Sequence, residues 1–245
     1  MRAEFEEYVV KGRQMYGMSF DFLITDPVAE DWYGPENQEM IERRWCVDNI
    51  KPGMVAADCG AHHGIMTLLF SKLVGPDGFV YSYEILPDNA EIVRRNVELN
   101  RLVNVEVFPY GIGDTVMNTL ALSHHGNGVA SSSGDVSVSI VPLDLQFGRK
   151  RQVHFLKIDV EGSELAALRG ARETIKEHRP LIDLEVHNFL FKDPRSVLVG
   201  IFEFLAEGWA IEVSDNQNPT EPIDWKADLD RLSAMFNPHI FFKPI

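Results

Sequence analysis

Apolar and polar positions follow their clearest pattern between residues 54 and 84. Residues 54–57 are apolar or small and follow a Pro-Gly stop, which is typical of a buried parallel strand. A loop at 58–64 leads into a largely apolar helix at 65–74, and residues 79–83 alternate into a second strand that ends at Glu84. This pattern predicts a βαβ unit with glycines in its first turn and an acid at the end of its second strand.

The rest of the chain continues the alternation of strands and helices. Further strands are predicted at 104–108, 117–122, 136–141, 153–158, 180–186, 209–213 and 239–243, and further helices at 36–50, 87–101, 164–170 and 194–206. The last two strands are expected to pair as an antiparallel hairpin at the sheet edge. The helix at 36–50 is amphipathic, and Arg43 and Arg44 belong to its predicted exposed side.

Two segments lack a strong periodic pattern. Residues 1–35 are predicted to be irregular or partly helical, with a short strand at 20–24, and to cap the βαβ unit or simply extend over a sheet edge. Residues 124–135 are rich in Gly and Ser and are predicted to form a mobile loop.

The first turn and the acid after the second strand suit an adenosine-containing ligand, whose ribose hydroxyls the acid can bind. A dinucleotide needs closely spaced glycines for its pyrophosphate, but residues 61–63 (Ala-His-His) separate Gly60 from Gly64. The loop also starts with Asp58, whose charge repels a pyrophosphate and attracts the sulfonium and ammonium of S-adenosylmethionine. The loop therefore favours S-adenosylmethionine, and a turn that serves packing alone stays an alternative.

A second informative stretch, at 153–171, ends another buried strand in acids. Lys157 lies within this apolar strand, where an ammonium needs a partner, and a structural pair with a carboxylate such as Asp159 explains it. Asp159, Glu161 and Glu164 follow at the carboxyl end of the strand, where open α/β sheets bind ligands. Three acids crowd there only if they bind cations, share protons or point outward.

The next strand also ends in polar side chains at this edge, namely Glu185, His187 and Asn188. Histidine titrates near neutral pH and is the usual general base, so His187 is the first candidate base, with Asp159 and Glu161 as second choices. A structural, hydrogen-bonded histidine is the alternative. In a further variant, Asp159, Glu185, His187 and Asn188 hold a divalent metal such as Mg²⁺.

The composition suits one α/β domain of ordinary globular character. The 245 residues are 45% hydrophobic and 24% charged, and 23 Lys and Arg against 37 Asp and Glu give a net charge of −14. A surface this acidic disfavours nucleic acid as a partner. Cys46 and Cys59 form no disulfide or metal-ligand pattern, and no signal segment or apolar run of about 18 residues predicts membrane contact. A cytoplasmic setting is expected, and a homodimer is left open.

Three stretches resemble the FkbM family of S-adenosylmethionine-dependent methyltransferases. They are V-A-A-D-C-G-A-H-H-G at 55–64, Y-S-Y-E at 81–84 and L-K-I-D-V-E-G-S-E-L-A-A-L-R-G-A at 156–171, and the similarity covers roughly residues 51–188. The resemblance implies an α/β, Rossmann-like class I methyltransferase fold with a seven-stranded, mostly parallel sheet, a reversed last strand and helices on both faces. Residues 1–50 would form a cap and lead-in helix, and residues 51–245 the methyltransferase domain.

The resemblance also implies roles for particular residues. It places Asp58, Gly60, Ala61 and Gly64 at the methionine end of the cofactor, Glu84 on the ribose, Gly113 and Asp114 beside adenine, and Asp159 and Glu161 facing the methyl group and the acceptor. The family typically methylates hydroxyl oxygens of natural products or sugars, so a small-molecule hydroxyl is the expected acceptor, with no metal in the leading hypothesis. The alternatives are a divalent-metal-assisted O-methyltransferase, a non-catalytic cofactor-binding module and an NAD-linked dehydrogenase.

Overall fold

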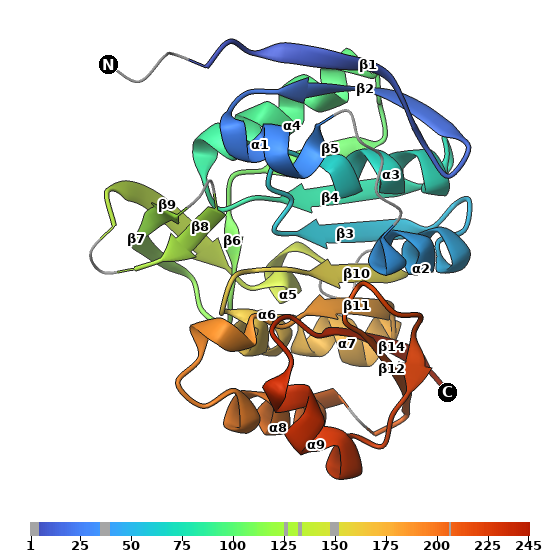
Figure 1. Ribbon diagram of the computed structural model, residues 1–245, viewed down its shortest axis with the longest axis vertical. Coiled ribbons are helices and arrows are strands. Elements are labelled where there is room, and N and C mark those ends of the chain that lie inside the picture. The colour runs from blue at the N-terminus through green and yellow to red at the C-terminus, as the bar shows by residue number, and fades with distance from the viewer. Residues whose placement is uncertain (1–4, 35–39, 125–126, 132–133, 148–151, 206) are drawn as a thin grey trace.

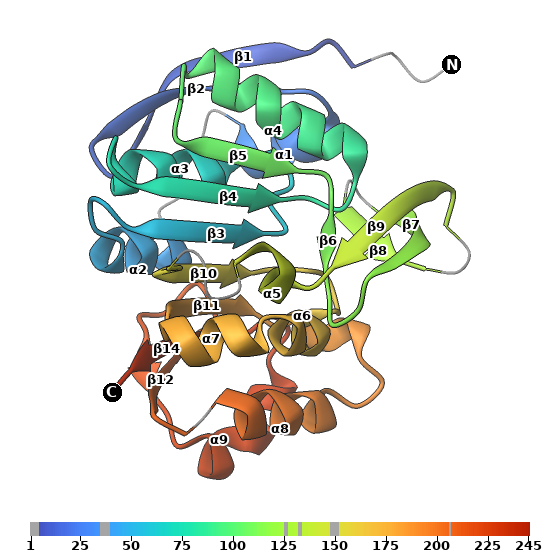
Figure 2. The ribbon, with the colours of Figure 1, turned by 180° about the vertical axis from the view of Figure 1, so that it is seen from behind.

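The computed structural model describes residues 5–34, 40–124, 127–131, 134–147, 152–205 and 207–245. In this part of the chain, helices on both faces enclose a central sheet with the strand order β13-β12-β14-β11-β10-β3-β4-β5 (Figures 1 and 2). The strands of this sheet are β3 (Val55–Cys59), β4 (Phe79–Tyr83), β5 (Val105–Phe108), β10 (Phe155–Ile158), β11 (Leu181–Glu185), β12 (Trp209–Ser214), β13 (Glu221–Pro222) and β14 (His239–Pro244).

The topology confirms the predicted α/β class with a mostly parallel sheet and a reversed last strand. Strands β3, β4, β5, β10 and β11 are parallel, whereas β14 is antiparallel to both of its neighbours, β11 and β12. The two-residue strand β13 adds an eighth strand at the edge. The last two predicted strands pair antiparallel as expected (β12 with β14), but β14 lies inside the sheet and not at its edge, which corrects that part of the prediction. Phe241 and Phe242 of β14 are fully buried on opposite faces, which suits an interior strand.

Alternate residues of the strands supply two separate cores, one on each face of the sheet. Ala56 and Phe155 face helices α2 (Ile41–Asn49), α3 (Ile65–Val74) and α4 (Pro87–Leu99). Ala57 and Leu156 face the other core, to which helices α5 (Leu143–Gln146), α6 (Glu164–Gly170), α7 (Arg172–His178), α8 (Pro194–Leu205) and α9 (Trp225–Ala234) contribute. Within the described residues no helix is long and apolar enough to cross a lipid bilayer.

The N-terminal segment is more ordered than its sequence pattern predicts. An antiparallel hairpin of β1 (Tyr8–Met15) and β2 (Met18–Ile24) precedes helix α1 (Pro27–Tyr33). Phe20, Phe22 and Ile24 of the hairpin are buried in the same core as α3 and α4. The predicted short strand at 20–24 is present, but it has a partner strand that the sequence pattern did not indicate. Helix α2 begins at Ile41, later than predicted, and residues 35–39 lie outside the described residues.

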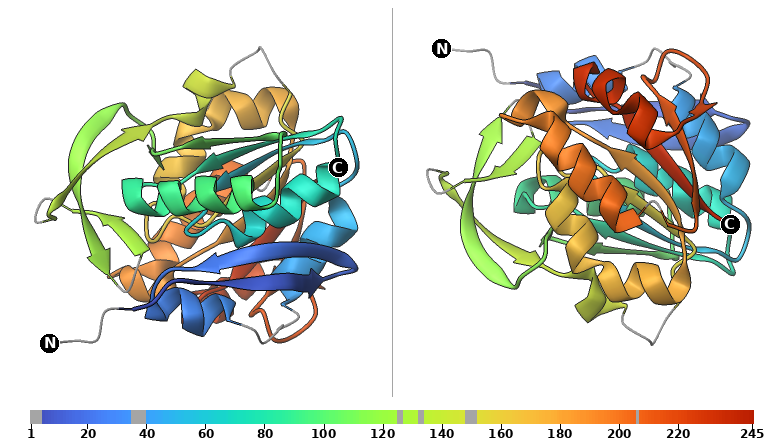
Figure 3. Two further views of the ribbon diagram at one scale, coloured as in Figure 1. Left: turned by 90° about the horizontal axis from the view of Figure 1, so that it is seen from above. Right: turned by 90° about the horizontal axis from the view of Figure 1, so that it is seen from below.

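A second small sheet stands beyond the carboxyl ends of β3, β4 and β10 and curves away from the layered body (Figures 1 and 3). Its strands are β6 (Gly111–Ile112), β7 (Met117–His124), β8 (Asn127–Ala130) and β9 (Val136–Val141), in the order β6-β9-β7-β8. The mobile loop predicted at 124–135 is corrected in part, because residues 127–130 pair with β7. Residues 125–126 and 132–133 lie outside the described residues.

Candidate functional site

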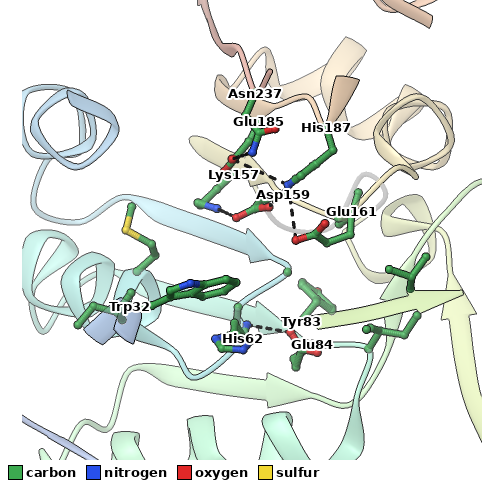
Figure 4. A pocket seen from close by; sticks show the side chains of 18 of the residues that line it. Trp32, His62, Tyr83, Glu84, Lys157, Asp159, Glu161, Glu185, His187 and Asn237 are labelled. Carbon is green, nitrogen blue, oxygen red and sulfur yellow. Dashed lines mark hydrogen bonds and ion pairs between the residues drawn. The ribbon is translucent and has the colours of Figure 1, made fainter. Parts of the chain in front are cut away.

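A cavity of about 1280 Å³ opens at the carboxyl edge of the parallel strands. The first loop, helix α1, the small sheet and the segments that follow β10 and β11 line it. Figure 4 shows Lys157, Asp159, Glu161 and His187 on one side of this cavity and His62 and Glu84 on the other. Open α/β sheets bind their ligands at this edge, so the sequence and the fold point to the same place.

The first loop forms part of the floor of the cavity. Gly60 and Ala61 donate backbone hydrogen bonds to the Tyr83 carbonyl at 2.9 and 3.0 Å, and both residues line the cavity as predicted. Gly60 has a φ of +90°, and a Cβ atom there would lie 1.7 Å from the Asp159 carbonyl oxygen. Only glycine therefore lets the loop lie against the end of β10.

The structure corrects the predicted contacts of Asp58 and Gly64, which do not line the cavity. The Asp58 carboxylate is fully buried, and its Oδ2 accepts a 2.5 Å hydrogen bond from the Thr67 hydroxyl. Burial raises the pKa of Asp58 to about 6, although Lys157 and Thr67 oppose this rise. Gly64 is the N-cap residue of α3 and packs against Val93. Asp58 and Gly64 therefore support the loop on its side away from the cavity.

Glu84 lies where its predicted role requires, at the end of β4 on the wall of the cavity. Its two carboxylate oxygens accept hydrogen bonds from the backbone N–H groups of His62 (2.8 Å) and Leu86 (2.9 Å). Burial raises the pKa of Glu84 to about 7, against the effect of these two donors. The carboxylate is therefore fixed in orientation, and each oxygen keeps a lone pair for a further donor.

Gly113 and Asp114 also do not line the cavity, and the Asp114 side chain is exposed. Strand β6 already begins at Gly111, two residues before Gly113. The Gly113 carbonyl packs against Gly170, where an added Cβ atom would lie 1.8 Å from the Gly113 carbonyl oxygen. The cavity is lined instead by Tyr110, Gly111 and Ile112, with Ile85 and Ile140 close by. In the sequence, the apolar Ile112 between Gly111 and Gly113 is the feature that marks this part of the cavity wall.

Lys157 forms the predicted pair with Asp159. Lys157 is 2% exposed, and its ammonium lies 2.7 Å from Asp159 Oδ2 and 3.4 Å from Glu42 Oε1. Burial alone would raise the pKa of Asp159, but Lys157 and His187 hold this pKa below its ordinary value. Sequence reasoning missed Glu42, because it comes from α2, more than a hundred residues before Lys157.

His187 lies among carboxylates. Its Nδ1 is 2.7 Å from Glu164 Oε1, and its Nε2 is 3.6 Å from Asp159 Oδ1 and 3.5 Å from Glu161 Oε1. Burial disfavours the charged imidazole, but the hydrogen bond to Glu164 and the nearby carboxylates raise the pKa of His187 to about 9. At neutral pH this side chain is an imidazolium, which corrects the prediction of a free base.

Glu161 combines backbone strain with a position on the cavity wall. Its φ is +47°, in the left-handed region that non-glycine residues rarely adopt and that is found at functional sites. Burial raises the pKa of Glu161, although His187 opposes this. A carboxylate with a raised pKa in contact with the cavity can accept a proton from a bound ligand.

The predicted metal-ligand set is only partly assembled. Asp159, Glu161 and His187 offer ligand atoms that all lie within 4.8 Å of one another. Glu185 Oε1 is 3.9 Å from His187 Nε2 and accepts a hydrogen bond from Asn237 at 3.1 Å. Asn188 Nδ2 donates to the backbone carbonyls of residues 232 and 235, which fixes the Asn188 side chain against the segment after α9.

The paired histidines of the first loop hold the cap helix. His62 Nδ1 lies 2.9 Å from the Tyr33 hydroxyl, and the His62 and His63 rings stack at 4.1 Å. His63 Nε2 lies 3.5 Å from Asp26 Oδ2, at the N-terminus of α1. The Trp32 ring lies 5.1 Å from His62 and lines the cavity, so α1 is docked on the loop as a cap.

An aromatic pair that the sequence analysis did not identify lies beside the acids. Phe189 and Phe236 stack with ring centroids 4.5 Å apart and planes 8° apart, and they line the cavity while 49% and 70% exposed. Phe189 also lies 5.9 Å from the His187 ring. These rings give an apolar surface next to the acidic wall.

Residues 58–208, more than half of the chain, match the family model of the methyltransferase FkbM domain. The chain belongs to this FkbM family. This membership confirms the resemblance seen in the sequence and identifies S-adenosylmethionine as the cofactor. The glycine turn, the fixed Glu84 carboxylate and the apolar wall at Ile112 fit the methionine, ribose and adenine parts of that cofactor.

The chain is also similar to methyltransferases of known name or structure. The chain is 30% identical to the ribosomal protein L11 methyltransferase of Thermoanaerobacter sp. (strain X514) over 108 residues. These matched residues make up 44% of this chain and 32% of that protein. The crystal structure of an FkbM methyltransferase from Methylobacillus flagellatus KT superimposes on this chain with a TM-score of 0.51 and 17% sequence identity. The superposition covers 89% of this chain and 48% of that one. The chain thus spans about a third of the first relative and about half of the second.

A third comparison concerns a putative methyltransferase from Streptococcus mutans, whose structure contains S-adenosylhomocysteine (SAH). Its TM-score is 0.53 and its identity is 11%, over 86% of this chain and 100% of that one. At this identity the likeness shows the shared fold.

Proposed function

We propose that the protein transfers a methyl group from S-adenosylmethionine to a hydroxyl oxygen of a small molecule. The observation that supports this most directly is that Asp159, Glu161 and His187 share one cavity with Gly60 and Glu84. Methyl transfer is a single displacement, so the protein has to align the acceptor oxygen with the methyl group and take up a proton.

Cofactor binding in this proposal follows the cavity from end to end. Gly60 and Ala61 lie under the methionine part, Glu84 accepts hydrogen bonds from the ribose hydroxyls, and residues 110–112 lie beside adenine. When bound, the cofactor supplies an electrophilic methyl group. Asp58, which the sequence placed at the methionine end, does not line the cavity and supports the loop through its hydrogen bond with Thr67.

Glu161 is the base in the proposed reaction. Its raised pKa and its place on the cavity wall suit it to take the hydroxyl proton as the acceptor oxygen takes the methyl group. Asp159, fixed by Lys157, accepts a hydrogen bond from the acceptor and orients it. His187 holds Asp159 and Glu161 in place through its positive charge.

The shape and charge of the cavity support a small acceptor. A volume of about 1280 Å³ exceeds the ~300–1,000 Å³ of ordinary ligand pockets, so it has room for the cofactor and a second molecule. The stacked Phe189 and Phe236 suit an acceptor with a ring next to the reacting hydroxyl. The net charge of −14 disfavours RNA or DNA. The free thiols of Cys46 and Cys59 support a cytoplasmic setting.

Labelled cofactor tests the proposal. The protein is incubated with methyl-labelled S-adenosylmethionine and an extract of the source organism that has been separated into small molecules, RNA and protein. We expect the label in the small-molecule fraction, as a methyl ether that resists base. Glu161→Gln should reduce the transfer by a factor of about 10² to 10⁴ while SAH binding stays within about twofold.

The exposed Glu177 on α7 supplies the matched control, because Glu177→Gln removes the same charge far from the cavity and should transfer at the wild-type rate. Label in RNA or protein, or in a base-labile ester, would contradict an O-methyltransferase for small molecules.

A metal-assisted reaction is the second candidate, because Asp159, Glu161 and His187 could together hold a divalent cation. In that version the metal would polarise the acceptor hydroxyl, and His187 would have to lose its proton to bind. Elemental analysis of the purified protein and transfer in the presence of EDTA separate the two versions. Transfer that survives EDTA in metal-free protein dismisses the metal-assisted one.

A further inference from the structure

Two phenylalanines form a flat apolar surface on the cavity wall, the phenylalanine platform. Phe189 lies in the short 3₁₀ helix η1 (Asn188–Leu190) after β11, and Phe236 lies in the segment after α9. Their rings stack 4.5 Å apart, and both line the cavity. Phe236 is 70% exposed although Phe189 covers one of its faces. Exposed aromatic rings that meet in a cavity mark a surface for an apolar part of a ligand.

Polar contacts hold the phenylalanine platform in place. The Asn188 amide donates hydrogen bonds to the backbone carbonyls of residues 232 and 235 at 2.9 and 2.8 Å, and the Asn237 amide donates to Glu185 Oε1 at 3.1 Å. Figure 4 shows the contact between Asn237 and Glu185. Each asparagine is the sequence neighbour of one phenylalanine, so the two segments are tied together on both sides of the stack. A platform formed in advance loses little conformational entropy when a ring binds to it.

The phenylalanine platform adjoins the groups of the proposed reaction. The Phe189 ring meets the His187 ring at a steep angle, with centroids 5.9 Å apart. The next residue, Leu190, lies against the turn after β10, because a Cβ atom at Gly162 would be 3.4 Å from Leu190 Cδ1. Glu161, the proposed base, directly precedes Gly162. A ring on the platform therefore lies beside the turn that carries the base.

The other walls of the cavity have different characters. Ile112 and Ile140 line the end where adenine is expected, and that apolar surface is assigned to the cofactor. On the side of α2 the wall is charged, with Glu42 and Arg43. Arg43 is only 5% exposed, which corrects its predicted place on the exposed side of α2. The phenylalanine platform is thus an apolar surface beside the acids that the cofactor does not occupy.

We propose that the acceptor is a phenol whose aromatic ring stacks on the exposed face of Phe236 and whose hydroxyl points to Glu161. The inference rests on the proposed function and narrows its acceptor. The phenol oxygen gains the methyl group as the carbon–sulfur bond of the cofactor breaks, and the phenol proton passes to Glu161, which leaves SAH neutral. Stacked aromatic rings attract one another through their π-systems, which a saturated sugar ring lacks.

The acidity of the hydroxyl also favours a phenol. A phenol has a pKa of about 10, as tyrosine does, whereas an aliphatic hydroxyl is close to the ~16 of water. Burial raises the pKa of Glu161 above its ordinary value. The pKa of this base is therefore much closer to that of a phenol than to that of a sugar hydroxyl, which makes proton transfer more favourable.

A matched pair of alcohols tests the aromatic acceptor. 2-Naphthol and decahydro-2-naphthol share one carbon skeleton and one hydroxyl, and only 2-naphthol is aromatic. Both are titrated by calorimetry into SAH-saturated wild type and Phe236→Leu. We expect the wild type to bind 2-naphthol at least about fivefold more tightly than the saturated alcohol. Phe236→Leu keeps an apolar side chain and should lose about threefold to tenfold in affinity for 2-naphthol alone.

Phe204→Leu is the matched control, because Phe204 lies on α8 against Arg172 and does not line the cavity. This variant should bind both alcohols as the wild type does. Equal wild-type affinity for the two alcohols, an equal loss for both in Phe236→Leu, or no binding of 2-naphthol would overturn the inference.

Turnover separates this inference from the proposed function. With S-adenosylmethionine we expect 2-methoxynaphthalene, detected by mass spectrometry, to form at least about tenfold faster than a methyl ether of decahydro-2-naphthol or of methyl glucoside. Turnover of the saturated alcohol or the glucoside at or above the rate of 2-naphthol would overturn the phenol and leave methyl transfer to a small-molecule hydroxyl standing. Label in RNA or protein in the extract experiment would instead contradict the proposed function itself.

Discussion

A row of polar side chains crosses the middle of the sheet and determines much of the chemistry of single residues. Ser82, Asp58, Lys157 and Asp183 are direct neighbours in register on β4, β3, β10 and β11. The Lys157 ammonium is surrounded by acids in this buried row, so it stays charged and fixes Asp159 at the cavity. Asp58 and Asp183 do not line the cavity, so the site depends in part on buried charges behind its wall.

His187 gives the most direct test at this scale. Its pKa is 6.5 in the unfolded chain and about 9 in the folded protein, so its stabilising effect is complete below pH 6.5 and is lost as pH rises through about 9. We expect wild type to exceed His187→Gln in free energy of unfolding by about 3 kcal/mol at pH 6 and by little at pH 10. Urea unfolding at a series of pH values measures this difference. A difference that does not change with pH would mean that His187 is neutral in the folded protein.

The sequence predicted the site residues that follow strands and missed those that come from elsewhere. Glu84, Asp159, Glu161 and His187 end strands at one edge, and the structure places all four on the cavity wall. Arg13, Glu42 and Phe236 reach the same cavity from a hairpin, a helix and a loop, and only tertiary packing brings them there. Asp58 was misplaced because alternation along β3 turns its side chain toward α3.

At the scale of elements, the first loop and the end of β10 lie in backbone contact. This contact holds Gly60 against Asp159, and the stacked histidines dock α1 onto the same loop. The sequence predicted β3, α3, β4 and α4 to within about two residues because each has a clear period and a Gly or Pro boundary. It missed β1, although its partner β2 follows after two residues, and α9, which packs on α8.

Gly60→Ala tests the loop contact. The substitution adds a Cβ atom 1.7 Å from the Asp159 carbonyl at a φ of +90°, so we expect a loss of at least about 3 kcal/mol in unfolding free energy together with weaker SAH binding. Gly53→Ala is the matched control, because Gly53 also has a positive φ (+82°) but has nothing within 4 Å of the added atom. It should cost only about 1 kcal/mol. Equal losses of unfolding free energy in the two variants would show that the positive φ alone causes the loss and that the close contact with Asp159 adds nothing.

At the scale of the whole molecule, one cavity is lined by residues from the N-terminal hairpin to the segment after α9, among them Arg13, Gly60, Asp159 and Phe236. The hairpin and α1 share a core with the sheet, which argues against a separable cap, although residues 1–50 and 51–245 stay a useful division of roles. The α/β fold class followed from the sequence, because alternating strands and helices permit few topologies. The small sheet at 111–141 followed only in part. The strands predicted at 117–122 and 136–141 are β7 and β9, whereas β6 and β8 were not predicted, because strands of two to four residues have weak local signals.

The central claim is that this cavity binds S-adenosylmethionine through its adenosine end at Glu84. Calorimetric titration with SAH of the wild type, Glu84→Gln and the exposed control Asp114→Asn tests it most directly. We predict stoichiometric binding by the wild type, a loss of about tenfold or more in Glu84→Gln, and wild-type affinity in Asp114→Asn. No binding of SAH by the wild type, or binding of NAD in its place, would contradict the account.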